Sequence, residues 1–177
     1  MEPLLHFVVP FVALTLAGFK LQKALPLAFL ALIPDLDAFF MVHRSLSHSA
    51  LILVLASLPF FASAYKIKRE ALKTCFFGLT SFLSHVVLDV FSGYTPIFWP
   101  LYDKALWVET GLSVHVGGSV GLSAYIDLLK TPVTFETFES FDAPIYTSGG
   151  IVLSLALLSP FIIKALIRFT RSIRKML

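Results

Sequence analysis

The chain has 177 residues and a formal net charge of +3; 57% of its residues are hydrophobic and 14% are charged. An ordinary soluble domain is about 45–50% apolar and about 25% charged, so this composition predicts a polytopic membrane protein forming one domain, residues 1–177. The single cysteine, Cys75, excludes an intramolecular disulfide and a cysteine-based zinc site. Any bound metal must be held by His, Asp or Glu, which suits zinc, manganese or iron.

Five apolar runs follow one another along the sequence and predict the membrane-spanning segments. They cover residues 4–19, 25–42, 50–65, 74–91 and 151–167. Each is close to the about 17–25 residues that a helix needs to cross a bilayer. We therefore expect an all-α membrane bundle of about five spans.

The first two runs carry additional signals. Run 4–19 follows an acidic residue and precedes two lysines, the reverse of the charge order in a secretory signal peptide, so we expect a retained span. Run 25–42 is interrupted by Pro34-Asp35-Leu36-Asp37. Because the residue before a proline avoids helical angles, we expect Ile33 to end one helical piece and Asp35 to begin the next. A broken helix at membrane depth must line a cavity or lie buried in protein.

Residues 92–150 differ in character from the apolar runs. Gly, Pro, Thr, Ser and aromatic residues occur throughout, and the apolar content is too interrupted to span a membrane. We expect a long extracytoplasmic loop before the last span. Trp99, Tyr102 and Trp107 predict that part of this loop lies at the level of the lipid headgroups.

The basic residues support this topology. With the N-terminus outside, eleven of the fourteen Lys and Arg residues fall in the loop after the first run, the loop 66–73 and the C-terminal tail. The exceptions are Arg44, Lys104 and Lys130. This distribution follows the positive-inside rule and predicts a multi-pass protein of the cytoplasmic membrane with its C-terminus in the cytoplasm. The basic tail then contacts anionic lipid, and no nucleic-acid partner is expected.

Ionisable side chains gather in two clusters beside the apolar runs. The first lies within residues 34–49, and the second is His85-Val86-Val87-Leu88-Asp89. Charges in apolar surroundings are costly unless they pair or bind an ion. Because His85 and Asp89 are four apart, they share one face of a helix and can reach the same ion. The alternative is a buried His–Asp hydrogen bond that joins two spans.

The first cluster combines carboxylates, imidazoles and a guanidinium. Asp35 and Asp37 diverge by about 200° on a regular helix, but they can converge on an irregular turn. Alternatively, one caps a helix and the other faces water. His43 and His48 follow with Arg44 between them. Arg44 can clamp a phosphate through its planar fork, or it can form a salt bridge with Asp35 or Asp37.

The remaining polar residues are assigned more simply. Ser47 and Ser49 are expected to orient imidazoles, and His115, which has no partner at helical spacing, is left outside the site. The candidate groups all fall on the predicted outer side, which favours one shared metal site over separate pairs. His43 is a further candidate ligand. The predicted metal ligands are His6, Asp35, Asp37, His48, His85 and Asp89.

These residues resemble a known family, the YdjM-like inner-membrane proteins. Its pattern is an early His, then Pro-Asp-x-Asp, His-Arg-x-x-[Ser/Thr]-His-Ser, Ser-His-x-x-x-Asp, and an aromatic segment with Pro. The chain carries these in order as His6, Pro34-Asp35-Leu36-Asp37, His43-Arg44-Ser45-Leu46-Ser47-His48-Ser49, Ser84-His85-Val86-Val87-Leu88-Asp89 and Pro96-Ile97-Phe98-Trp99-Pro100. Ser45 departs from the pattern, since members commonly have Gly there. The resemblance implies a membrane-bound divalent-metal hydrolase with phospholipase-like activity. The pair His85-x-x-x-Asp89 is also similar to ligands of zinc phospholipases C.

We therefore expect a hydrolase that uses zinc, or else manganese or iron, to activate water. It would cleave a phosphoester bond of a phospholipid or lipid-linked phosphate, so its partners are the lipid bilayer and that lipid substrate. Arg44 would hold the phosphate, and His43 or Asp37 would act as general base. The alternative is a non-enzymatic metal-binding or ion-translocating membrane protein. An inverted repeat of the kind common in transporters is not evident in the sequence.

Overall fold

The structure is a computed structural model that describes residues 2–117, 120–135, 137–140 and 144–174. Within these residues, α-helices, short 3₁₀-helices and one pair of strands alternate along the chain. In chain order they are α1 (Pro3–Leu16), α2 (Leu21–Phe29), η1 (Leu30–Leu32), η2 (Pro34–Phe40), η3 (Leu46–His48), α3 (Ala50–Ile67), α4 (Ala71–Ser92), β1 (Lys104–Val116), β2 (Val120–Pro132) and α5 (Ser148–Arg174).

The strands β1 and β2 form an antiparallel hairpin, so the all-α prediction is wrong and the fold is mixed. They pair from Lys104 opposite Pro132 to Val116 opposite Val120. The even-numbered positions of both strands are mostly apolar, and the odd-numbered positions carry most of the polar residues. This period of two is typical of a strand with two unlike faces. A search for long apolar runs misses it, and the predicted loop 92–150 therefore contains a hairpin.

The prediction of about five spans is also wrong. In the described chain, three helices are long and apolar enough to cross a membrane, namely Ala50–Ile67, Ala71–Ser92 and Ser148–Thr170. Helix α1 has only 14 residues. At a rise of 1.5 Å per residue it is about 21 Å long, which is less than the about 30 Å of a bilayer's hydrocarbon core.

The second apolar run fails as a span because it changes helix type. Helix α2 ends at Phe29, and the chain continues as η1 and η2. Pro34 takes the first position of η2, where the missing N–H costs no helical hydrogen bond. Ile33 is the C-cap of η1, so one helical piece ends there as predicted, although its backbone keeps helical angles (φ −63°, ψ −39°). Asp35 lies in the first turn of η2, but Ile33 is the N-cap and no side chain caps this helix, so the prediction that Asp35 begins it from a capping position is wrong.

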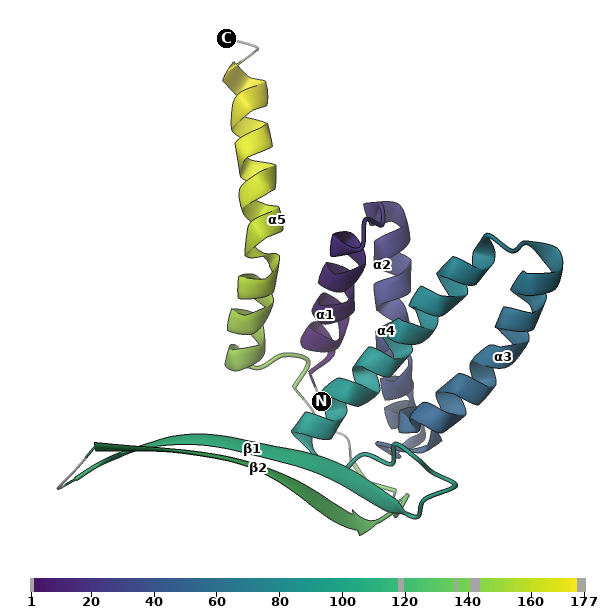
Figure 1. The fold of residues 1–177 in the computed structure, drawn as a ribbon, viewed down its shortest axis with the longest axis vertical. Coiled ribbons are helices and arrows are strands. Elements are labelled where there is room, and N and C mark those ends of the chain that lie inside the picture. Colours follow the sequence, from purple (N-terminus) through teal and green to yellow (C-terminus); the bar gives the residue numbers. More distant parts are fainter. Residues whose placement is uncertain (1, 118–119, 136, 141–143, 175–177) are drawn as a thin grey trace.

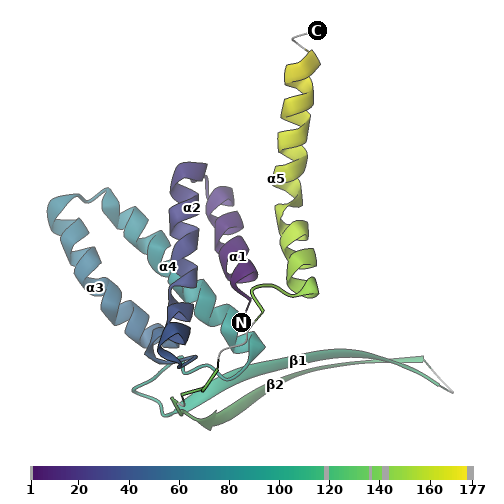
Figure 2. The same cartoon turned by 180° about the vertical axis from the view of Figure 1, so that it is seen from behind.

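Figure 1 shows the helices side by side, with the hairpin lying across one end of them. The opposite view in Figure 2 shows α5 at one edge of the row and α3 at the other. A small apolar core joins α1 and α2, where Leu14 and Leu27 pack with the fully buried Ala24 and Ala28. Small residues at such contacts let helices approach closely without a large core.

The two ends of this row differ in charge. The link between α1 and α2, the link between α3 and α4, and the end of α5 lie away from the hairpin (Figures 1 and 2). Lys20 lies in the first link and Lys23 in the first turn of α2, and the basic segment 66–73 includes the second link. The start of α1, the segment 34–49 and the end of α4 lie at the hairpin end. The candidate ligands therefore gather at the end opposite the basic links.

Candidate metal centre

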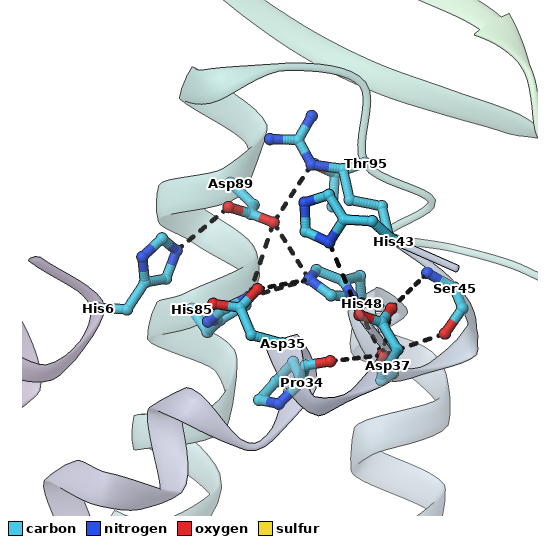
Figure 3. Close-up of polar contacts among 12 residues, drawn as sticks. His6, Pro34, Asp35, Asp37, His43, Ser45, His48, His85, Asp89 and Thr95 are labelled. Atoms are coloured by element: carbon cyan, nitrogen blue, oxygen red, sulfur yellow. Dashed lines mark hydrogen bonds and ion pairs between the residues drawn. The ribbon is translucent and has the colours of Figure 1, made fainter. Parts of the chain in front are cut away.

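Four separate segments supply the candidate side chains (Figure 3). His6 comes from the first turn of α1, and His85 and Asp89 come from the last two turns of α4. Helix η2 carries Asp35 and Asp37, and His48 ends η3 directly before α3. Because η2 and η3 are short 3₁₀ segments joined by a tight loop, residues eight to thirteen apart in sequence reach the same place. All six predicted ligands therefore lie near one another.

Four side-chain atoms converge at the middle of this cluster. His48 Nε2 lies 3.0 Å from His85 Nε2. Asp35 Oδ1 lies 3.5 Å from each of these nitrogens. Asp89 Oδ2 lies 3.3 Å from His48 Nε2 and 3.7 Å from His85 Nε2. The side chains of His48, His85 and Asp89 are completely buried, so water does not solvate these polar atoms.

These spacings fit a divalent cation. Zinc ligands bind at about 2.0–2.2 Å in a tetrahedron, which places the ligand atoms roughly 3.3–3.6 Å apart. The five distances given above, each of which involves a histidine nitrogen, run from 3.0 to 3.7 Å. Within the described residues, neither Asp35 Oδ1 nor Asp89 Oδ2 accepts a hydrogen bond. Two buried carboxylate oxygens that accept no hydrogen bond, facing two ring nitrogens, form a ligand set that a cation would satisfy.

Asp37 lies on the other side of His48. Its Oδ2 atom is 3.2 Å from His48 Nδ1, and it also accepts hydrogen bonds from the Ser45 N–H at 2.9 Å and the Ser47 hydroxyl at 3.0 Å. We assign the Nδ1 proton of His48 to the bond with Asp37, which leaves the Nε2 lone pair directed at the centre. Asp35 and Asp37 thus do converge on one residue, but at opposite nitrogens of its ring.

Protonation follows from these contacts when no cation is bound. Burial alone would lower the pKa of His48, but the nearby carboxylates of Asp35, Asp37 and Asp89 outweigh it and raise that pKa to about 9. Burial alone would raise the pKa of Asp37, but its contacts with His43, His48 and the Ser45 N–H hold it well below its usual range. The ion-free centre therefore holds a proton on His48 that a metal would have to displace.

Asp89 connects the centre to His6. His6 Nδ1 donates to the Glu2 carbonyl at 2.9 Å, and His6 Nε2 lies 3.2 Å from Asp89 Oδ1. One side chain therefore uses Oδ1 toward His6 and Oδ2 toward the centre. His6, His85 and Asp89 form one group whose ligand atoms lie within 4.8 Å of one another, and Asp35, His43 and His48 form a second. The cluster thus has ligands enough for one or two ions.

Arg44 is held by the protein on three sides. Its Nη2 donates to the Ser92 hydroxyl at 2.7 Å and its Nη1 to the Tyr94 carbonyl at 3.3 Å. Its Nε lies 3.4 Å from Asp89 Oδ2. The salt bridge considered from the sequence is therefore formed, but with Asp89 rather than with either aspartate of the first cluster. A methyl group on Gly93 would lie 2.2 Å from Arg44 Nη1, so only glycine admits this approach.

His43 lies at the edge of the cluster. Its Nδ1 atom is 3.6 Å from Asp37 Oδ1, and its side chain is 25% exposed, whereas that of His48 is completely buried. The rings of His43 and His48 meet edge to face. Met41, two residues before His43, and Arg44, directly after it, take left-handed backbone angles (φ 56° each). These angles turn the loop sharply, so that His43 and Arg44 point toward the cluster.

Some roles were not visible in the sequence. Ser47 contacts His48 Nδ1 at 3.1 Å, as expected, but Ser49 does not orient an imidazole. Ser49 instead caps α3 by accepting from the Ile52 N–H, and its hydroxyl donates to the Trp99 carbonyl at 2.6 Å. His115 contacts Ser123 on the hairpin, apart from the cluster. The Arg44 partner Ser92 was missed too; its place just after Asp89 was the only signal for it.

Two pockets reach the carboxylates of the cluster. Asp35 lines a pocket of about 370 Å³ between the start of α1 and η2. Asp37 lines another of about 540 Å³, together with Ile33 and Phe135. The histidines themselves line neither pocket, so both openings approach the centre from its acidic side.

Comparison with known proteins identifies the family. The family model of the YdjM inner membrane proteins matches residues 1–169. No curated protein and no solved structure gives a significant match. The match includes every residue of the cluster described above. The chain belongs to the family of YdjM inner membrane proteins.

Proposed function

We propose that this protein is a membrane-embedded, metal-dependent hydrolase that cleaves a phosphoester bond of a phospholipid or lipid-linked phosphate. The observation that carries the proposal is the convergence of His48 Nε2, His85 Nε2, Asp35 Oδ1 and Asp89 Oδ2. A structural hydrogen-bond network would pair each of these atoms with a donor or acceptor. Here Asp35 Oδ1 and Asp89 Oδ2 make no hydrogen bond within the described chain and have only ion-pair contacts of 3.3 to 3.7 Å.

These four residues would hold the cation, with His6 as a further ligand beside Asp89. When bound, zinc or a similar divalent ion supplies Lewis acidity, which makes a water molecule acidic near pH 7 and offsets charge on phosphoryl oxygens. Asp37 and Ser47 keep His48 oriented through its Nδ1 atom. The ligand side chains are thus held in place by neighbouring residues that do not themselves bind the cation.

His43 and Arg44 supply the remaining chemistry. His43 is partly exposed and its Nδ1 atom lies 3.6 Å from Asp37 Oδ1, so it is placed to act as general base. Arg44 holds Asp89 in place and brings a positive charge to the edge of the centre. That charge suits a phosphate, which Arg binds through its planar fork.

We place the hairpin end at the outer face of the cytoplasmic membrane, with the N-terminus outside. The support is the separation of charge between the two ends of the molecule. The basic segment 66–73, which joins two helices long enough to span, lies away from the candidate ligands. Cytoplasmic loops carry an excess of such residues. The centre would then meet lipid phosphates of the outer leaflet.

A metal assay tests the proposal. The full chain is purified in detergent as wild type, His85→Ala and His115→Ala, and bound metal is measured by elemental mass spectrometry. We expect about one or two ions per chain in wild type and His115→Ala, and loss of metal in His85→Ala. Hydrolysis of phosphatidic acid and phosphatidylglycerol is then measured with that ion. Wild type without metal after loading with zinc and manganese would overturn the assignment.

A non-enzymatic metal protein is the second candidate, because the ligands are so deeply buried. His48, His85 and Asp89 have no exposed side-chain surface, and closed sites of this kind are typical of structural metals. The same assay separates the two candidates. Three results together would favour the structural role. The wild type binds stoichiometric metal, His85→Ala loses this metal and melts at a lower temperature, and the wild type releases no phosphate or headgroup.

A further inference from the structure

An apolar groove of about 420 Å³ opens between α2, α3 and α4. We call it the lateral groove. Leu30 and Ile33 line it from the segment after α2, Leu53 and Ala56 from α3, and Gly78 and Phe82 from α4. Helices α3 and α4 are both long and apolar enough to span the membrane, so we expect this groove to face acyl chains rather than water.

The lateral groove ends next to the metal centre on all three of its walls. Ile33 is two residues before Asp35, Phe82 is three residues before His85, and Leu53 is five residues after His48. On α4 the groove runs from Thr74 to Phe82, which is about 12 Å at the helical rise. The groove therefore runs along the spans and stops about one helical turn from the ligands.

A second pocket continues from this end. The pocket of about 540 Å³ beside Asp37 shares Ile33 with the lateral groove and adds Ser45 and Ser47 to its lining. An apolar groove and a pocket that contains a carboxylate and hydroxyls thus meet at one side chain. Such a pair matches a molecule with a hydrocarbon tail and a polar head, and its volumes lie in the usual range of ligand sites.

We propose that the lateral groove binds an acyl chain of the lipid whose phosphate reaches the metal centre. This inference rests on the proposed function. The groove offers no hydrophobic gain, because a lipid tail already lies in hydrocarbon. The groove would instead contribute by positioning the substrate, because an acyl chain fixed beside Phe82 holds the headgroup next to His85 and Asp35. Misplacement of reacting groups by about 1 Å can cost about 100-fold in rate.

Groove-filling variants test this assignment. Ala56 lines the groove and is exposed, so Ala56→Trp fills it without crowding a core. Ala62 is exposed on the same helix but does not line the groove, so Ala62→Trp is the matched control. If Ala56→Trp fails to fold, Ser57→Phe fills the same groove from the adjacent position.

The first readout does not require turnover. The full chain is reconstituted with zinc in phosphatidylcholine vesicles that contain phosphatidic acid with a diazirine in one acyl chain, and labelled residues are mapped by mass spectrometry. We expect label on groove residues of α3 and α4, reduced at least fivefold by Ala56→Trp and unchanged by Ala62→Trp. Diacylglycerol with the same diazirine should label the groove at least fivefold less. Equal labelling by both lipids would mean ordinary boundary lipid and would overturn the inference.

The second readout separates this inference from the proposed function. Hydrolysis of dioleoyl phosphatidic acid is compared with that of p-nitrophenyl phosphate, which has no acyl chain. We expect Ala56→Trp to lower kcat/KM for the lipid about tenfold or more and to leave the soluble ester unchanged. If Ala56→Trp hydrolyses both substrates as fast as the wild type, the groove is overturned and the hydrolase is kept. Selective labelling without any hydrolysis would keep the groove and overturn the hydrolase.

Discussion

The candidate metal centre and the hairpin contain the same kinds of residue, yet only the former resembles a binding site. The hairpin places Glu109 directly opposite Asp127 and carries His115 near its tip. Its Asp127 is exposed, and His115 contacts only a serine hydroxyl among the contacts described for it. In the centre, His85 and Asp89 are completely buried and face further ionisable groups. Burial and convergence, rather than residue type, distinguish the two regions.

The difference has a physical cause. An exposed carboxylate is solvated by water and needs no counter-ion, so Asp127 can face Glu109 at little cost. A buried carboxylate has lost that solvation and must be paired or bind a cation. The same substitution should therefore have a large effect in the centre and almost none on the hairpin. Each prediction below uses a hairpin residue as its control.

Asp89→Asn should have the largest effect. The carboxylate lies 3.2 Å from His6, 3.3 Å from His48 and 3.4 Å from Arg44, and asparagine keeps its shape but removes its charge. Leaving buried partners unpaired costs about 3–5 kcal/mol. We expect loss of bound metal and a large drop in unfolding free energy, measured by elemental mass spectrometry and denaturant unfolding in detergent. Asp127→Asn should change neither; an equal effect of both would contradict the comparison.

Asp37→Asn should weaken the centre without abolishing it. Asp37 orients His48 through Nδ1 and does not reach the converging atoms, so it acts as an outer partner. Loss of such a partner lowers metal affinity by about 10–100-fold. The Kd for zinc is measured by competition with a chelator, with Glu109→Gln as control. An Asp37→Asn protein that cannot be loaded with metal at all would instead make Asp37 a direct ligand.

The pH dependence of metal binding should also distinguish the regions. The pKa of His48 in the ion-free protein is about 9, above the usual 6.5 for histidine. Below this pKa a metal must displace the proton, so affinity should rise about tenfold for each pH unit until the pH reaches the pKa and then level off. The Kd for zinc, measured across the neutral to mildly alkaline range, tests this slope. His115→Ala should keep it, and a flat profile would place the displaced proton elsewhere.

The sequence was a better guide to which polar side chains lie together than to the fold. Particular residues show the reason. Asp35, His48, His85 and Asp89 are costly in apolar surroundings, so their meeting could be inferred from placement alone. The hairpin required a search for a period of two. In β1, for example, Leu112, Val114 and Val116 alternate with Ser113 and His115, and this alternation never builds a long apolar run.

Contacts between distant segments were the part that the sequence could not supply. Arg44 and Asp89 are 45 positions apart, and their pairing depends on how the loop before α3 packs against the end of α4. The choice among Asp35, Asp37 and Asp89 as the partner of Arg44 is therefore a matter of tertiary packing. Ser49 illustrates the same limit, because its partner Trp99 lies 50 residues away.

Gly93→Ala should have the smallest effect, and it tests which group Arg44 serves. Gly93 has a φ of +158°, which side chains rarely adopt, and the new methyl group would lie 2.2 Å from Arg44 Nη1, so the flexible guanidinium must move and lose contacts with Tyr94 and Asp89. We expect unfolding free energy to fall by about 1–3 kcal/mol, the usual cost of leaving a buried polar group without its partner. Gly121→Ala on the hairpin meets open space and is the control. A guanidinium that only positions Asp89 would change metal affinity when it moves. If stability and metal affinity stay unchanged while KM for a phosphoester rises, Arg44 therefore binds the substrate rather than positioning Asp89.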